Sequence, residues 1–274
     1  MSNRYKICFE FDGLNFFGSQ KQPDKRTVQQ ELENSIRTLI KEDISIIPSG
    51  RTDAKVSAKY QTAHFDSVQK IDDLDKCRYK LNCILPEDLK ILSIECINPH
   101  FHAQKSAKYK HYRYTIQNDH VASVFSLHSL FYPYFELDVD KINKMLSYLV
   151  GHHDFSAFKS ASDNPYNDCI IYFAQAHRET IERHDFIFVD IVGNRFLYNM
   201  IRTIIGEILY ILRNNLDPKL MDDILKSKDR TKAKDVIDAK GLCLEYVGYD
   251  EPTNYVKNLF KERQTNEDIQ CKTS

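Results

Sequence analysis

A short polar segment at residues 49–53, SGRTD, lies between two stretches that have the pattern of strands. A loop that leaves the end of a strand can hold a carboxylate at the rim of a cleft, and Gly50 allows the backbone to turn sharply before it. Asp53 is therefore a candidate catalytic residue. An aspartate in a turn more often has a structural role, bonding to its own backbone, and the loop alone does not decide between the two roles.

Arg202 lies in the middle of a strongly apolar stretch, residues 195–212, that is expected to form a largely buried helix. Its apolar residues are Phe196, Leu197, Met200, Ile201, Ile204, Ile205, Ile208, Leu209 and Leu212. A buried guanidinium without a carboxylate partner is costly. We therefore expect Arg202 to reach solvent or to pair with an acid from elsewhere in the chain, and the pattern does not identify that acid.

Basic and aromatic residues alternate along residues 102–116. The basic residues are Lys105, Lys108, Lys110, His111 and Arg113, and the aromatic ones are Tyr109, Tyr112 and Tyr114. Basic side chains can bind phosphates while aromatic faces stack on bases, as in proteins that bind single-stranded or flipped-out nucleotides. A solvated edge strand, whose lysines discourage aggregation, is an equally good interpretation of this segment.

The elements that must position these residues have an α+β pattern. In the first half, strands are expected at 5–11, 44–47, 61–68 and 89–97, with helices from Val28, after a capping box of Thr27 and Gln30, and at 74–85. This order is ferredoxin-like. In the second half, strands are expected through 112–116 and at 170–181, 186–192 and 242–249, with helices at 138–149, 195–212 and 218–226. The predicted domains are 1–98 and 99–250, followed by a polar tail, 251–274, that is expected to be frayed.

Composition indicates a soluble globular protein. The 274 residues are 42% hydrophobic and 28% charged, with a formal net charge of −1. No stretch approaches the ~20 consecutive apolar residues of a membrane-spanning helix, and no secretory leader precedes the first strand, so a cytoplasmic location is expected. The seven cysteines include no C-x-x-C pair and the ten histidines no H-x-x-x-H spacing, so we expect no metal site.

Motifs distributed from Tyr5 to Tyr249 resemble, in order and in spacing, those of the TruA family of tRNA pseudouridine synthases. GRTDA followed by QTAHFD resembles the family's active-site loop, and NRFLYNMIRTIIG its buried helix with an arginine. The other matching segments are FDGLNFFGSQKQ, TVQQELE, LNCILPEDL, FHAQKSAKYKHYRYTI, HDFSAF, KSKDR and AKGLCLEYVGY.

The resemblance implies roles for individual residues. Asp53 matches the family's catalytic aspartate, and Arg51 the neighbour that helps to displace the target base from its stack. Tyr112 matches the tyrosine whose ring lies on the uracil, and Arg202 the arginine that pairs with the aspartate and is expected to keep it ionised. Together with Arg51 and Tyr112, we expect Lys55, Lys105, Lys108, Lys110 and Arg113 to contact RNA.

The resemblance also implies a fold and a reaction. Two ferredoxin-like or RRM-like halves are expected to join mostly antiparallel sheets into one, with helices on one face and the RNA cleft on the other. The implied enzyme is a homodimeric tRNA pseudouridine synthase that isomerises uridines 38 to 40 of the anticodon stem-loop without a cofactor.

Four positions depart from the family pattern. Lys55 and Ser57 replace a glycine and a histidine, Gln104 replaces an arginine, and Ser19 replaces a tryptophan and is expected to leave a smaller platform in the first loop. A paralogue that modifies another RNA or tRNA position, or a non-catalytic RNA-binding protein, therefore remains an alternative to the anticodon-stem enzyme.

Overall fold

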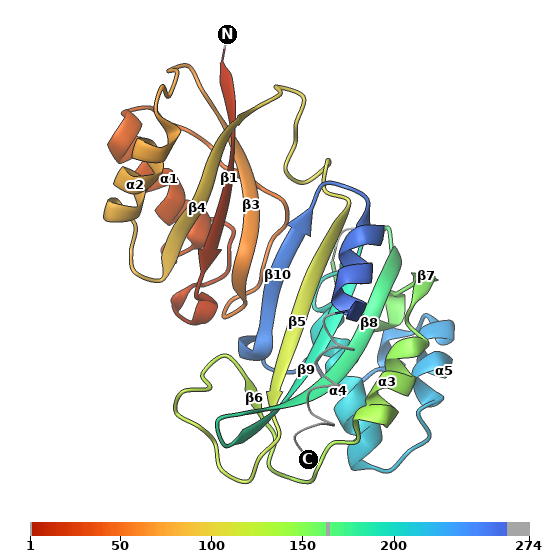
Figure 1. Ribbon diagram of the computed structural model, residues 1–274. Helices are drawn as coiled ribbons and strands as arrows, with labels where there is room; N and C mark the ends of the chain where they lie inside the picture. The colour runs from red at the N-terminus through yellow and green to blue at the C-terminus, as the bar shows by residue number, and fades with distance from the viewer. Residues whose placement is uncertain (1, 163–164, 262–274) are drawn as a thin grey trace.

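The computed structural model describes residues 2–162 and 165–261. One ten-stranded sheet forms its centre, with the strand order β4-β1-β3-β10-β5-β9-β8-β7, while β2 pairs with β3 and β6 with β5 (Figure 1). Among these pairs, β10 with β3 and β5 with β6 are parallel and the others are antiparallel. The predicted combination of helices with one large, mostly antiparallel sheet is thus confirmed.

The first half follows the expected order of elements. These are β1 (Asn3–Phe11), α1 (Val28–Ile40), β2 (Ile47–Pro48), β3 (Ser57–Ser67), α2 (Leu74–Ile84) and β4 (Leu89–Ile97). The capping box predicted at Thr27 is wrong, because the Thr27 side chain makes no capping hydrogen bond. Instead, the amides of Val28 and Gln29 donate to the carbonyls of Gly18 and Ser19, which ties the start of α1 to the loop before it.

The second half contributes the other half of the sheet and three helices. Its elements are β5 (Tyr109–Gln117), β6 (Leu130–Phe131), α3 (Val139–Ser147), β7 (Gly151–Asp154), β8 (Asp168–Ile181), β9 (His184–Gly193), α4 (Met200–Arg213), α5 (Leu220–Ser227) and β10 (Leu242–Gly248). Helix α4 begins five residues later than the apolar pattern suggested, because Asn199 before it adopts a left-handed conformation with φ of 60°. The short strands β6 and β7 were not predicted.

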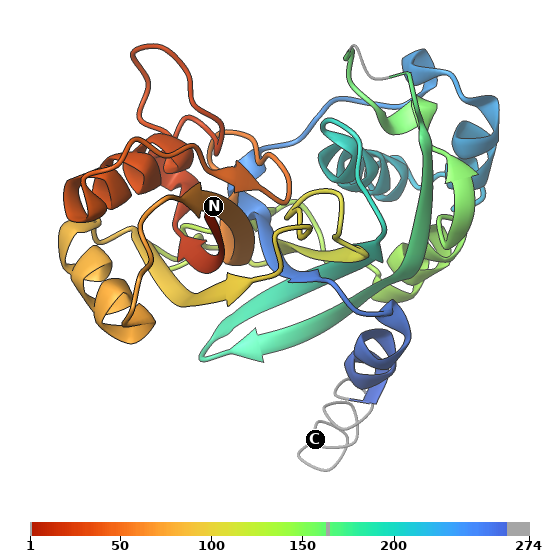
Figure 2. The same ribbon diagram turned by 90° about the horizontal axis from the view of Figure 1, so that it is seen from above.

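Two separate groups of apolar side chains cover the two faces of the sheet. The larger core includes the inward residues of β1, β3 and β5 and the apolar stripes of the five labelled helices. The smaller one joins Tyr109, Phe173 and Val192 to Leu259. Leu259 belongs to a further helix, 252–261, which lies on the other side of the sheet from α4 (Figure 2). The expectation of a frayed tail is therefore wrong for these residues.

The labelled helices form two groups at opposite ends of the sheet. Helix α1 packs on α2, which covers β4, whereas α3 covers β8 and packs on α4, and α4 packs on α5 (Figure 1). The central strands β3, β10 and β5 lie between these groups. Within the described residues, no helix is both long enough and apolar enough to span a membrane.

Candidate active site

Asp53 and Arg202 are 149 residues apart in the chain and meet above the central strands. Arg202 Nη1 donates to Asp53 Oδ2 over 3.3 Å. The same guanidinium donates from Nε to the carbonyl of Ile237 at 2.7 Å and from Nη1 to Asn199 Oδ1 at 2.8 Å. Arg202 is thus fixed by three hydrogen bonds. Pairing with an acid from elsewhere in the chain was one of the two outcomes expected for Arg202, and Asp53 is that acid.

Burial and Arg202 act in opposite directions on Asp53. Desolvation raises the pKa of this carboxyl, the positive charge of Arg202 lowers it, and the net direction is upward. Arg202 therefore stabilises the ionised form of Asp53, but the effect of burial on the pKa is larger. The side chain of Asp53 is one-third exposed, so the carboxylate remains open to a substrate.

Tyr112 of β5 is the third candidate at this place. Its side chain is buried, and its ring packs edge-on against Phe196 with 5.1 Å between the centroids. Burial raises the pKa of the phenol, and the negative charge of Asp53 raises it further. The phenol is thus protonated at neutral pH. The structure therefore brings Asp53 and Arg202 into contact and places Tyr112 close enough to Asp53 to feel its charge.

The three side chains lie on the side of the sheet that bears the labelled helices. Tyr112 belongs to the same core as residues of α4, whereas its neighbours His111 and Arg113 contact Asp190 on the opposite face. These three side chains therefore lie on the helix-bearing face, whereas the RNA cleft was expected on the other face. The candidate site lies at the central strands, between the two groups of helices (Figure 1).

The first loop braces the loop that carries Asp53. Ser19 Oγ accepts a hydrogen bond from the Thr52 amide at 2.8 Å, and the Ser19 amide donates to the Thr52 carbonyl at 3.0 Å. Ser57 Oγ accepts from the Gly13 amide at 3.0 Å. Ser19 is buried, and its side chain braces the active-site loop. No signal in the sequence pointed to these roles.

Lys110 holds the start of the same loop. Its Nζ donates to the Ser49 carbonyl at 3.0 Å, and a Cβ added to Gly50 would lie 2.5 Å from this nitrogen. Burial lowers the pKa of Lys110 to about 8, and the positive charge of Arg195 adds to this effect. A lysine that we expected to contact RNA thus contacts the backbone beside Asp53.

Segment 233–238 supports Arg202 from the other side. A Cβ at Gly206 would lie 2.4 Å from the Asp235 carbonyl, so glycine permits the segment to pack directly on α4. Glu207 Oε2 accepts a hydrogen bond from the Lys234 amide at 2.8 Å. These contacts place the Ile237 carbonyl that accepts from Arg202.

The remaining candidates are not all near Asp53. Arg51 and Lys55 are exposed on its own loop, and Lys105 and Lys108 are exposed in the segment that leads into β5. Arg113 lies on the opposite face, where Nε and Nη2 bond to the buried Asp190 at 2.8 and 3.2 Å. Residues alternate between the two faces along a strand, and this rule separates Arg113 from Tyr112.

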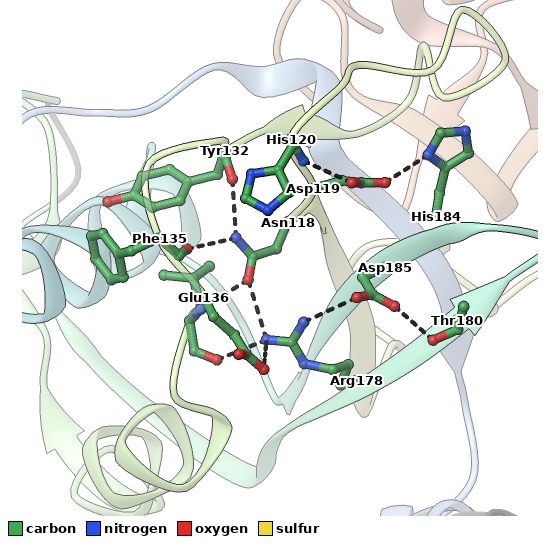
Figure 3. Close-up of polar contacts among 11 residues, drawn as sticks. Asn118, Asp119, His120, Tyr132, Phe135, Glu136, Arg178, Thr180, His184 and Asp185 are labelled. Atoms are coloured by element: carbon green, nitrogen blue, oxygen red, sulfur yellow. Dashed lines mark hydrogen bonds and ion pairs between the residues drawn. The ribbon is translucent and has the colours of Figure 1, made fainter.

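A second polar cluster lies at the far end of β5. Asn118 accepts a hydrogen bond from Arg178 and donates to the carbonyls of Tyr132 and Phe135, while Asp119 contacts His184 at 2.7 Å (Figure 3). These bonds join the segment between β5 and β6 to the hairpin of β8 and β9. Because the side chains are engaged with one another, we assign this cluster a structural role.

Comparisons with known proteins agree with the geometry. The family model described as tRNA pseudouridine synthase matches residues 7–122 and 145–250. The chain is 37% identical over 246 residues to "tRNA pseudouridine synthase A" of Brevibacillus brevis, and the aligned region covers 90% of this chain and 99% of the relative. It is 38% identical over 249 residues to the protein of the same name from Bacillus licheniformis, with the same coverage.

Proposed function

The chain belongs to the tRNA pseudouridine synthase family, and on that premise we propose that it converts uridine to pseudouridine in the anticodon stem-loop of tRNA, at positions 38 to 40. The observation that carries this proposal is the pair of Asp53 and Arg202 beside Tyr112. A carboxylate, a fixed cation and an aromatic ring are the groups that this isomerisation needs around a uridine.

The reaction rearranges one nucleotide and consumes no other molecule. The bond between N1 of uracil and C1′ of ribose breaks, the uracil turns, and C5 bonds to C1′ while C5 loses a proton and N1 gains one. Asp53 can attack the sugar, attack the base or remove a sugar proton, and each role requires the ionised carboxylate. Because burial raises the pKa of Asp53, activity should increase as pH rises through that value.

Tyr112 and the closed surroundings retain the detached base. The ring of Tyr112 is suited to stack on the uracil and leave its edges free to turn. Because its phenol is protonated, it can accept the proton that C5 loses only while it passes its own proton on to N1, which gains one. A site between two groups of helices limits the escape of the free base into water. No cofactor takes part in any of these steps.

Exposed basic residues are the RNA contacts in this proposal. Arg51 displaces the target base from its stack, and Lys55, Lys105 and Lys108 contact phosphates. We give Lys110 and Arg113 structural roles, because each is bonded to the protein itself.

The larger assembly follows from the family. Two ferredoxin-like or RRM-like halves form the subunit, two subunits form a homodimer, and tRNA bound across one subunit presents its anticodon stem to the other. The enzyme acts in the cytoplasm, where its tRNA substrates are found.

The test is to incubate the purified protein with unmodified tRNA, without a cofactor, and to map pseudouridines by carbodiimide treatment and primer extension. We expect stops on the 3′ side of the anticodon stem. Asp53→Asn should form no product while its affinity for tRNA stays within a few-fold of that of the parent. Asp72→Asn, which alters an aspartate that is 85% exposed, is the matched control and should stay active.

Each other outcome has a distinct meaning. Stops elsewhere in tRNA, or in other cellular RNA alone, would indicate the divergent paralogue. Lys55 favours that alternative, because it adds an exposed positive charge two residues from Asp53. No product from any RNA, or an active Asp53→Asn variant, would refute the proposed chemistry.

A further inference from the structure

An exposed aromatic ring lies at the edge of the candidate site. Half of the Phe17 side chain is accessible to solvent, whereas its neighbour Phe16 is buried. A phenyl ring that is exposed to water does not contribute the free energy that its burial would provide, so its exposure calls for an explanation. Single exposed apolar residues are common on proteins. Phe17 differs from those, because its two neighbours in the chain, Phe16 and Gly18, lie against the Asp53 loop.

The residues on both sides of Phe17 approach that loop. The next residue, Gly18, has a φ of 90°, and a Cβ added to it would lie 3.0 Å from the Thr52 carbonyl oxygen and 3.5 Å from the carbonyl carbon of Asp53. On the other side of Phe17, the Phe16 carbonyl accepts a hydrogen bond from the Lys55 amide at 3.4 Å. The backbone of Phe17 is therefore held between two contacts with the segment that carries Asp53.

Further hydrogen bonds fix the backbone from outside the site. The Phe17 amide donates to the Arg26 carbonyl at 2.9 Å, and Gln22 Nε2 donates to the Phe17 carbonyl at 2.7 Å. A ring on such a backbone loses little conformational entropy when a ligand binds to it. The loop thus presents the ring in a preorganised way.

A positive charge accompanies the ring. Lys25 Nζ lies 4.5 Å from the centroid of Phe17, which is a cation–π distance. An aromatic face next to an ammonium group matches the two parts of a nucleotide, because bases stack on aromatic rings and phosphates bind to lysine. Arg51 and Lys55 on the adjoining loop are exposed and extend the positive charge towards Asp53.

We propose that Phe17 stacks on a nucleobase next to the target uridine and that Lys25 binds the phosphate of that nucleotide. This inference rests on the proposed function, since it concerns the RNA that reaches Asp53. Phe17 is a positioning residue here. When the target base leaves its stack, the adjacent base loses a neighbour, and the phenyl ring replaces it. Such stacking tolerates any base, so it strengthens binding without selecting a sequence.

The test compares Phe17→Leu, which keeps an apolar side chain without an aromatic face, with Phe17→Tyr, which keeps the face. We expect Phe17→Leu to raise KM for tRNA by roughly tenfold to a hundredfold, with kcat within about twofold of the parent, and Phe17→Tyr to behave as the parent does. Phe125→Leu is the control, because Phe125 is 91% exposed but lies between β5 and β6. It should leave KM unchanged.

A second measurement does not depend on turnover. An anticodon stem-loop with 2-aminopurine beside the target uridine should lose fluorescence when it binds to the parent protein, and lose markedly less with Phe17→Leu. If Phe17→Leu keeps the parental KM and the parental quenching, the inference is overturned. If the parent forms no pseudouridine in any RNA, the proposed function fails, and the quenching of the two proteins alone decides the role of Phe17.

Discussion

Replacing Lys110 by methionine removes a buried charge and a hydrogen bond at the same time. Methionine has a similar length and no charge, so the cavity stays filled. Burial lowers the pKa of Lys110 in the parent from 10.5 to about 8, so its side chain is mostly protonated at neutral pH. At about 1.4 kcal/mol per pKa unit, this lowering reduces the free energy of unfolding by about 3 kcal/mol near pH 7.

The hydrogen bond acts in the opposite direction. Lys110 Nζ donates to the Ser49 carbonyl, and a hydrogen bond from a charged donor contributes about 1.5 to 3 kcal/mol. The two effects of Lys110→Met nearly cancel at pH 7. A single measurement of stability would therefore reveal little, whereas its dependence on pH separates the two effects.

The direction of that dependence follows from proton binding. Between about pH 8 and 10.5 the unfolded chain holds a proton on Lys110 and the folded protein does not, so the free energy of unfolding of the parent increases with pH. The methionine variant lacks this gain. Between pH 7 and pH 9, the parent should become more stable relative to the variant by about 1 kcal/mol.

Urea unfolding of both proteins at pH 7 and pH 9 measures this difference directly. Lys108→Met is the matched control, because the Lys108 side chain is 56% exposed and should show no such change. We also expect Lys110→Met to lower kcat by about tenfold, since the loop before Asp53 loses its support. An equal stability difference at both pH values would refute the description of Lys110 as a buried charge.

Two further substitutions test the supports on either side of the Asp53 and Arg202 pair. Gly206→Ala should reduce the free energy of unfolding by about 1 to 3 kcal/mol and lower kcat more than it changes KM. The reason is that the Asp235 backbone must move away from the new methyl group and take the Ile237 carbonyl, the acceptor of Arg202, with it. Urea unfolding and steady-state kinetics measure these effects, and a kcat equal to that of the parent would contradict the expectation. Ser19→Ala should reduce the free energy of unfolding by about 1 to 3 kcal/mol, because the buried amide of Thr52 loses its acceptor. Ser19→Thr keeps a hydroxyl and is the comparison. If Ser19→Ala is as stable as the parent, the hydrogen bond between Ser19 and Thr52 does not support the loop.

Local patterns predicted most of the helices and strands, because the spacing of apolar residues and the positions of turn residues depend only on neighbours in the chain. Alternation predicted β1 and β9 to within two residues at each end, and the apolar stripe predicted α4 from five residues before its start. The helix at residues 252–261 was missed although its signal is local. Tyr255, Val256, Leu259 and Phe260 have the i, i+1, i+4, i+5 spacing of an apolar helical stripe. In the structure, Leu259 and Tyr255 pack against Tyr109 and its neighbours on the second face of the sheet.

Physical reasoning from the sequence predicted only part of the candidate site. Physical reasoning predicted that Arg202 reaches solvent or pairs with an acid, but it could not select Asp53, because nothing local joins residues so far apart in the chain. The resemblance selected it. Strand alternation was available from the sequence and would have separated Arg113 from Tyr112. The bonds of Ser19 and Ser57 depend on how two loops approach each other in space, which no pattern in either loop reveals.

The origin of each group explains why the supports matter. Asp53 comes from the first half of the sheet, and Arg202 and Tyr112 come from the second. Strands β3 and β10 join the halves through a parallel pairing of only two registered positions, Ser57 with Cys243 and Ala58 with Leu244. Any rotation about this short junction changes the distance between Asp53 and Arg202 directly. At 3.3 Å it is the longest of the three bonds of Arg202, as catalytic hydrogen bonds often are before a substrate binds.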